Sequence, residues 1–179
     1  MKNMSNHTSL FIVALFGTLL LFVVGCGETL PPDMPKLYPT KVVIIQDGQP
    51  LEGANVQLLP KDPDSRWAAA GRTDSSGAVD FFTEGRYRGV PEGDYQVTVS
   101  KVYTEPSKYL GQKRPDDIDY PTWNRMMSEE KLNSYHLIDP VYDSRKTSTL
   151  ELTVGPKQPK DRQIDVGNAV NELIPSSRS

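Results

Sequence analysis

Hydrophobic residues follow two different patterns along the chain. Residues 10–24 (LFIVALFGTLLLFVV) form an unbroken, uncharged run of 15 residues, whereas from Thr40 onward short apolar runs alternate with polar positions. Clusters of Gly, Pro and Asp separate these later runs. Period-two alternation between turn residues is typical of β-strands that bury one face. The pattern therefore predicts an apolar N-terminal segment followed by an all-β domain.

The most regular alternation lies in residues 94–103 (DYQVTVSKVY), where Tyr95, Val97 and Val99 face one way and polar residues face the other. Such a strand buries one face and leaves the other in water. We expect further strands at residues 40–46, 54–59, 67–73, 78–83, 149–154 and 162–166.

Residues 104–136 interrupt this strand pattern. The segment is longer than an ordinary connection between strands, and loops of this length are usually functional or have structure of their own. Asp119 or Thr122 is a suitable N-cap for a helix that runs to about Tyr135. We therefore expect a partly helical insertion.

Aromatic and sulfur-containing residues in the insertion allow two interpretations. Trp123, Met126 and Met127 recur at helical spacing and would cover an edge or an open end of the β-domain. Alternatively, Trp123, Tyr109 and Tyr120 form an exposed recognition surface.

The apolar run is placed as in a secretory signal peptide. It follows a polar stretch with one basic residue, Lys2, and it is shorter than the roughly 20 residues of a transmembrane helix. It ends in Val23-Val24-Gly25-Cys26, which resembles the lipobox of bacterial lipoproteins. The alternative is an ordinary signal peptide or anchor with an incidental cysteine.

The lipobox resemblance implies that residues 1–25 are removed and that Cys26, the only cysteine, carries a diacylglyceryl group. Several acyl chains would hold the protein durably on a membrane. Residues 26–39 then form a Pro-containing tether. Because Gly27 and not Asp follows the cysteine, the resemblance favours the outer membrane or cell surface.

Composition excludes several classes of protein. The 20 Lys and Arg residues are outnumbered by 23 Asp and Glu residues, the isoelectric point is near 5.4, and no basic block is present, which argues against binding to nucleic acid. A mean hydropathy of -0.48 excludes a polytopic membrane protein. With its single cysteine lipidated, the chain has no disulfide, so its stability must come from the core.

Three ordered motifs extend the picture: DGQPLEGANVQL (residues 47–58), Thr73-Asp74 followed by Gly77 and Phe81, and VPEGDY (residues 90–95). They resemble the carboxypeptidase regulatory-like, or transthyretin-like, family of bacterial envelope proteins. This resemblance implies a seven-stranded, prealbumin-like β-sandwich over residues 40–154, interrupted by the insertion at 104–136. Residues 155–179 follow as a polar C-terminal strand and tail.

A second similarity concerns the end of the predicted sandwich. Residues 139–142 (DPVY), followed by a strand that begins Thr-Ser-Thr-Leu at Thr147, resemble the closing segment of small planctomycete-type lipoproteins. In those proteins a lipobox and a Pro-containing tether precede the same kind of domain.

Candidate chemical groups are few. His136 is the only histidine beyond the predicted signal peptide, and no G-x-S-x-G nucleophile motif accompanies it. Asp116, Asp117 and Asp119 form an acidic group better explained as a solvated loop than as a Ca²⁺ site, and zinc lacks its ligands. We also considered an isopeptide bond between Lys41 and Asn168. We expect no catalytic residue, no metal and no cofactor.

The sequence therefore predicts a lipid-anchored envelope protein with a non-catalytic β-sandwich that binds or scaffolds an unknown partner. Residues 104–136 are the expected contact with an envelope protein or a polysaccharide. One alternative is an accessory lipoprotein of an export or nutrient-uptake complex. Another is a carbohydrate-binding module, for which Trp67, Trp123 and Tyr109 would have to share one face. An enzyme would need His136 or the acidic group in a pocket.

Overall fold

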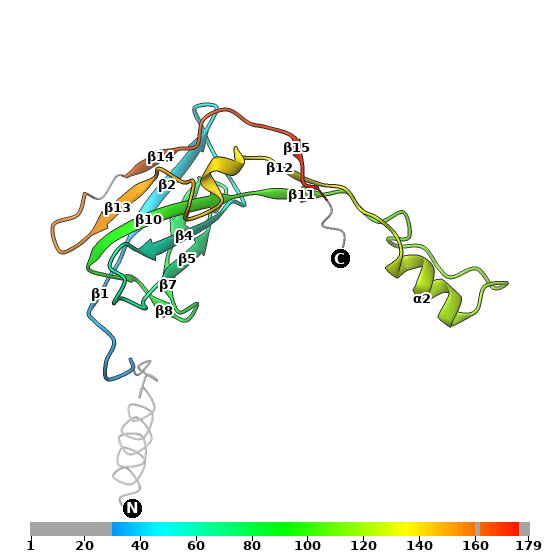
Figure 1. The fold of residues 1–179 in the computed structure, drawn as a ribbon, viewed down its shortest axis with the longest axis horizontal. Helices are drawn as coiled ribbons and strands as arrows, with labels where there is room; N and C mark the ends of the chain where they lie inside the picture. Colours follow the sequence, from blue (N-terminus) through cyan, green and yellow to red (C-terminus); the bar gives the residue numbers. More distant parts are fainter. Residues whose placement is uncertain (1–29, 160–161, 176–179) are drawn as a thin grey trace, which may run out of the picture. The chain divides into compact units, whose positions relative to one another are not determined.

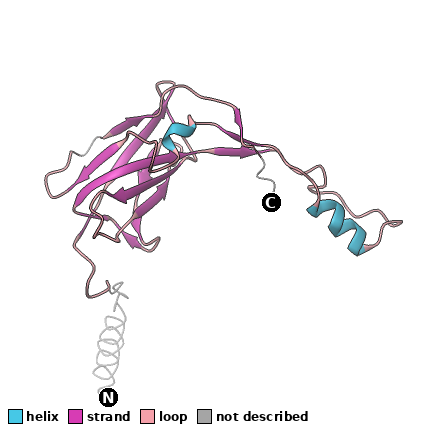
Figure 2. Ribbon diagram, viewed as in Figure 1, coloured by secondary structure: helices cyan, strands magenta, loops and turns pink. Residues whose placement is uncertain are grey.

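Alternating apolar residues form the strands of an all-β fold, as predicted (Figures 1 and 2). The structure, a computed structural model, describes residues 30–159 and 162–175. Every element below belongs to one unit of the chain, residues 33–179. The predicted signal peptide (residues 1–25) and Cys26 lie outside the described residues.

The larger sheet is antiparallel and is built around one long strand, β10 (Gly93–Ser100). Tyr95, Val97 and Val99 of β10 are buried, as the alternation predicts. The order of the sheet is β13 (Glu151–Val154), β10, β4 (Asn55–Pro60), β5 (Ala69–Arg72), β7 (Phe82–Thr83) and β8 (Tyr87–Arg88).

The second sheet is centred on β2 (Lys41–Gln46). Its partners are β3 (Gln49–Pro50), β6 (Ala78–Asp80) and β14 (Gln163–Asp165). β14 runs parallel to β2, so the C-terminal strand expected at residues 162–166 completes this sheet. A short pair, β1 (Leu37–Tyr38) with β9 (Val90–Pro91), begins within the segment expected as tether.

One chain segment passes from the second sheet to the first. β6 pairs with β2, β7 pairs with β5, and Phe81 between them is buried, whereas Phe82 faces outward. Gly71 of β5 permits this crossing, because a Cβ atom there would lie 2.3 Å from the carbonyl oxygen of Asp80. Phe81 and Phe82 therefore face opposite sides of the chain.

The two sheets enclose a single apolar cluster. Its buried side chains include Val42, Ile44 and Val79 from the second sheet and residues of β4, β10 and β13 from the first. Tyr95 contributes a buried ring, and its hydroxyl donates a 2.9 Å hydrogen bond to the carbonyl oxygen of Pro91. Burial of apolar surface from both sheets is the main source of stability in such a core.

Beyond β10 the chain forms a separate structure, which we call the arm (residues 101–137 and 172–174). It contains a three-stranded antiparallel sheet and one α-helix. Figure 1 shows the arm leaving the sandwich after β10 and carrying the helix at its far end. The elements are β11 (Val102–Thr104), α2 (Tyr120–Ser128), β12 (Ser134–His136) and β15 (Glu172–Leu173).

The helix of the insertion is shorter than predicted. It begins after Asp119, as expected, but ends at Ser128 and not near Tyr135. Residues 134–136 are strand β12, because their backbone groups pair with β11 on one side and β15 on the other. A short 3-10 helix, η1 (Pro140–Tyr142), returns the chain to the sandwich, capped by the Asp139 carboxylate.

Candidate functional site

Exposed apolar side chains gather on the arm. Ten large hydrophobic residues are exposed in the part of the chain that the structure describes, and seven of them belong to the arm. The seven are Val102, Tyr103, Leu110, Tyr120, Met127, Leu132 and Leu173. Exposed apolar surface that is concentrated on one element is a mark of an interaction site.

Trp123 anchors the tip of the arm, the part of the insertion between β11 and β12. Its side chain is only 8% exposed and meets the Tyr109 ring edge-on at 5.0 Å between centroids. Lys108 lies 4.8 Å above the Tyr109 ring. The expectation that Trp123 covers the sandwich is wrong, because α2 lies away from the sandwich (Figure 1). The expected exposed surface is right for Tyr120, which is 68% exposed, and wrong for Trp123, which is buried against Tyr109 within the insertion itself.

The carboxylate of Glu130, which follows α2, forms hydrogen bonds with the loop that precedes α2. Glu130 accepts a hydrogen bond from the Ser107 hydroxyl and a 3.0 Å hydrogen bond from the Lys108 backbone N–H. The Ser107 hydroxyl in turn accepts a bond from the backbone N–H of Tyr109 at 3.0 Å. The hydroxyl of Ser107, with a smaller contribution from the Lys108 N–H, lowers the pKa of Glu130.

Asp119 acts as the N-cap of α2. Its carboxylate accepts a 2.7 Å hydrogen bond from the backbone N–H of Thr122, and the bonds from Thr122 hold the Asp119 pKa below its ordinary value. Asp is among the preferred N-cap residues because it satisfies one of the free N–H groups of the first turn. This role explains one member of the acidic group; Asp116 and Asp117 are exposed.

The base of the arm carries a pair of tyrosines. The rings of Tyr103 and Tyr135 are stacked with centroids 6.5 Å apart. The Tyr135 hydroxyl donates a 3.0 Å hydrogen bond to Glu105, and this bond is the main reason that the pKa of Tyr135 is raised. Asn133 donates a second hydrogen bond to the same carboxylate at 3.0 Å.

The predicted catalytic and metal candidates do not form a site among the described residues. His136 lies in β12 with its Nδ1 atom 3.8 Å from a carboxylate oxygen of Asp143. Within residues 30–159 and 162–175 no three His, Cys, Asp or Glu side chains are grouped so that they could hold a metal ion.

The candidate partners for an isopeptide bond lie at opposite ends of β2. Lys41 is the first residue of β2 and pairs with Asp80. Asn168 lies near the opposite end, because the carbonyl oxygen of its neighbour Gly167 accepts a 3.0 Å hydrogen bond from the N–H of Asp47, which follows the last residue of β2. The isopeptide hypothesis is therefore wrong.

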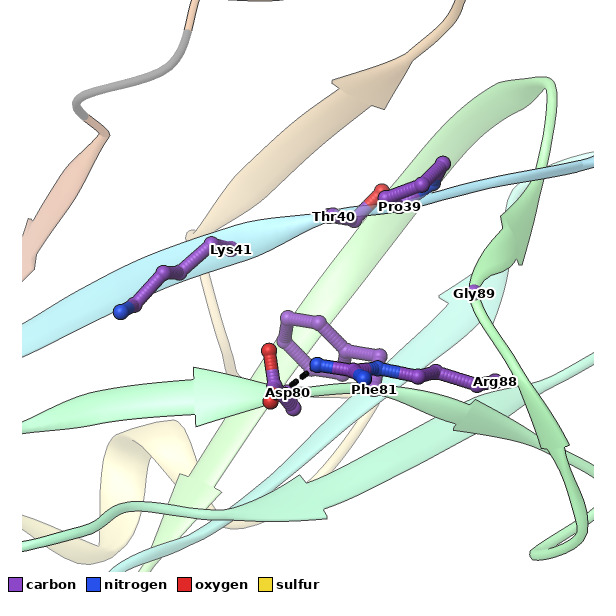
Figure 3. A pocket seen from close by; sticks show the side chains of 7 residues that line it. All are labelled: Pro39, Thr40, Lys41, Asp80, Phe81, Arg88 and Gly89. Atoms are coloured by element: carbon purple, nitrogen blue, oxygen red, sulfur yellow. Dashed lines mark hydrogen bonds and ion pairs between the residues drawn. The ribbon is translucent and has the colours of Figure 1, made fainter.

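A surface hollow of about 460 Å³ lies where the chain passes between the sheets (Figure 3). Phe81 lies behind it, and Arg88 reaches Asp80 with a 2.9 Å ion pair. The lining holds two cationic side chains, Lys41 and Arg88, and one acidic side chain, Asp80, and this small excess of positive charge does not by itself define a ligand. Its lining residues are Pro39, Thr40, Lys41, Asp80, Phe81, Arg88 and Gly89.

The aromatic side chains proposed for carbohydrate binding are not brought together. Trp67 lies in the loop before β5 at a separate cleft of about 330 Å³, whereas Trp123 and Tyr109 belong to the arm. The guanidinium of Arg66 covers the Trp67 ring at 4.4 Å. The aromatic platform of a carbohydrate-binding module is therefore not formed by these three residues.

Comparison with protein-family models, curated proteins and solved structures found no match for this chain. Among the described residues, no helix has the length and apolar character required to cross a membrane. Function is therefore inferred from the geometry above, and the arm is the candidate functional site.

Proposed function

We propose that this chain is a lipid-anchored cell-envelope protein whose non-catalytic β-sandwich presents the arm to another envelope protein. The observation that carries the proposal is that, of the ten large hydrophobic residues exposed within residues 30–159 and 162–175, seven lie on the arm. The sandwich supplies a stable support, and the arm supplies the contact.

The charge of the insertion favours a protein partner over a lipid surface. Residues 104–136 contain five basic and six acidic side chains, a net charge of -1. Helices that bind anionic lipid are rich in Lys and Arg on their polar face. Exposed apolar side chains accompanied by charges of both signs are the usual composition of a protein interface with a polar rim.

The sequence supports the remaining parts of the proposal. The apolar run, the lipobox-like Val23-Val24-Gly25-Cys26 and the absence of other cysteines support attachment through lipid on Cys26. A transthyretin-like sandwich is supported by Gly48, Gly53 and Gly77, whose positive φ angles allow the turns that the family motifs require. An accessory subunit of an export or nutrient-uptake complex is the more specific form of the same proposal.

The anchor is tested by Cys26→Ala in the full chain. We expect this variant to accumulate as an uncleaved precursor or to move to the aqueous phase on detergent partition, whereas the unmodified chain stays in the detergent phase. A mature Cys26→Ala protein in the detergent phase would contradict lipid attachment.

The contact is tested by site-specific photo-cross-linking in the cell envelope. A photoreactive residue at Leu110 or Tyr120 should give one discrete protein adduct, and the same group at Phe82, an exposed apolar position on the sandwich, should not. The purified partner should then bind the full chain saturably, at least tenfold more weakly after Leu110→Ser and unchanged after Phe82→Ser. Adducts of equal yield at all three positions, or with polysaccharide only, would overturn the proposal.

A further inference from the structure

One edge of β11 pairs with no other strand in the described part of the chain, and its residues are exposed. β11 lies at one edge of the three-stranded sheet, and its other side faces β12. The hydrogen bonds Leu137 N–H to Lys101 O and Glu105 N–H to Asn133 O show that Lys101, Tyr103 and Glu105 direct their backbone groups toward β12. The backbone groups of Val102 and Thr104 therefore point outward from the sheet.

Other edges in the described part of the chain differ from β11: β3, β8 and β15 are shorter, β14 is equally long but ends in the charged Asp165, and β13 is partly covered. On β13, the outward carbonyl oxygen of Thr153 accepts a 2.9 Å bond from Arg162. β15 has only two residues, one of which is the charged Glu172. β11 instead offers an uncharged edge, with Val102 50% and Tyr103 48% exposed. Proteins usually shield such edges with charge, proline or a covering segment, because open edges pair with other strands.

We propose that β11 pairs with β11 of a second copy of this chain, antiparallel and centred on Tyr103, to join two arms in one continuous sheet. In this register Val102 of each copy faces Thr104 of the other. These are the residues with outward backbone groups, so each facing pair forms both of its N–H···O bonds. The contact is two-fold symmetric, as the interfaces of most homodimers are.

Charge complementarity selects the second copy as the occupant. Centring on Tyr103 places Lys101 of each chain opposite Glu105 of the other, on the same face of the sheet as the tyrosine rings. Oppositely charged cross-strand neighbours stabilise a pair of strands. Tyr103 faces its own counterpart, so the stacked Tyr103 and Tyr135 rings of the two chains form one continuous row.

The neighbouring registers are disfavoured. Centring the pair on Thr104 would place Pro106 opposite Val102, and proline has no N–H for the ladder. Centring it on Val102 would place Ser100 opposite Thr104, but Ser100 is already paired with Asn55 in the sandwich. The register centred on Tyr103 uses residues 101–105 and avoids both conflicts.

Disulfide trapping of the full chain tests the register. Tyr103→Cys places a thiol opposite its own copy at a non-hydrogen-bonded pair, where the Cα atoms are close enough for a disulfide. Thr104→Cys is the matched control, because it faces Val102 of the other chain. We expect a reductant-sensitive dimer of Tyr103→Cys at least tenfold above Thr104→Cys, with the unmodified chain setting the background from Cys26. Equal yields in the two variants would overturn the proposal.

Two further variants separate this contact from misfolding. In the Tyr103→Cys chain, Lys101→Glu should reduce the dimer yield about fivefold, and Lys101→Glu with Glu105→Lys should restore it. Val102→Pro removes only an outward N–H, so it should leave the far-ultraviolet circular dichroism unchanged but keep the detergent-solubilised chain monomeric in sedimentation experiments. A dimer yield independent of these charges, or a monomeric unmodified chain at all concentrations, would contradict the proposal.

This self-association is tested separately from the proposed function, although it takes up Val102 and Tyr103, two of the seven exposed residues of the arm. It uses the edge of β11 at the base of the arm, whereas the proposed partner contact uses Leu110 and Tyr120 at the tip. Disulfide trapping can therefore fail while photo-cross-linking at the tip succeeds, and the reverse also holds.

Discussion

The sandwich and the arm bury their apolar residues to opposite extents. In the sandwich, side chains from two sheets form one continuous buried cluster. In the arm, Trp123 is buried, half of the large hydrophobic residues are exposed and the others are half-buried. The sandwich is held by apolar burial between distant segments, whereas the tip of the arm is held by one aromatic contact and a few polar bonds. Regions with few buried contacts open locally at lower free energy.

This difference separates stability from recognition. A change in the sandwich core should unfold the whole protein, and a change at the tip should loosen only the arm. The experiments below test that separation, beginning with the largest expected effect.

Tyr95→Ala should destabilise the whole protein. The substitution removes a ring that is 2% exposed at the centre of the cluster, and large-to-small changes of this kind lower the free energy of unfolding by about 3–5 kcal/mol. Denaturant unfolding followed by circular dichroism measures the loss. Phe82→Ala, the exposed neighbour of buried Phe81, is the control and should change stability by less than about 1 kcal/mol. An unchanged midpoint for Tyr95→Ala would mean that the core is not where the structure places it.

Trp123→Ala should loosen the tip and leave the sandwich intact. Loss of its contact with Tyr109 should increase hydrogen exchange across residues 105–133, with the free energy of global unfolding changed by less than about 0.5 kcal/mol. Exchange in β4 and β10 is the internal control. A fall in global stability as large as that of Tyr95→Ala would show that the arm and the sandwich form one cooperative unit.

The sequence predicted the sandwich better than the arm for a physical reason. Burial on one face of a sheet imposes a two-residue period, so Tyr95, Val97 and Val99 could be assigned from their alternation alone. No such period marks β12 or β15, whose partners lie far apart in the sequence. The burial of Trp123 depends on the edge of Tyr109, a contact that helical spacing does not encode.

The N-cap shows what local sequence does encode. Asp119 was recognised because it precedes a helical pattern and its bond to Thr122 spans only three residues. The exposed edge of β11 was not recognised, since exposure of an edge depends on which strands pair elsewhere. The lipidation of Cys26 stays a prediction.

Tyr95→Phe should sharpen the comparison with a smaller effect. It keeps the ring but removes the hydrogen bond to Pro91, so we expect a loss of about 1 kcal/mol. Burial raises the pKa of Tyr95 to about 12. Because an unfolded tyrosine ionises near pH 10, the native chain should lose stability as the pH rises from about 10 through 12.

Tyr95→Phe should remove this loss of stability at alkaline pH. In a titration followed by absorbance at 295 nm, the variant should show one fewer tyrosine that ionises at high pH. The pKa of Tyr135 is also raised, by its bond to Glu105, so Tyr135→Phe is the matched control. The control should remove a late-titrating tyrosine of the arm without the stability change that Tyr95→Phe produces. Identical alkaline unfolding in both variants would contradict the assignment to Tyr95.

The smallest expected effect is a loosening of the arm in acid. Asp119 and Glu130 have lowered pKa values because their carboxylates accept hydrogen bonds. A group with a lowered pKa in the folded state adds stability above its unfolded pKa, near 4, and that stability is lost as the pH falls below this value. The pKa of Asp74 in the sandwich is also lowered, by its hydrogen bonds with Ser76. Protonation of Asp74 should weaken one turn, but the buried core should still hold the sandwich folded.

We therefore expect acrylamide to quench the fluorescence of Trp123 more strongly as the pH falls from about 4 to 2. The measurement uses a Trp67→Phe chain, so that Trp123 in the arm is the only fluorescent tryptophan. Asp119→Asn is the matched variant, because asparagine also caps helices but does not titrate. It should weaken the pH dependence without unfolding α2 at pH 7, since the remaining part comes from Glu130. If quenching of Trp123 instead followed the loss of sandwich circular dichroism at every pH, the arm would have no separate stability, and its exposed residues would be part of the cooperative fold.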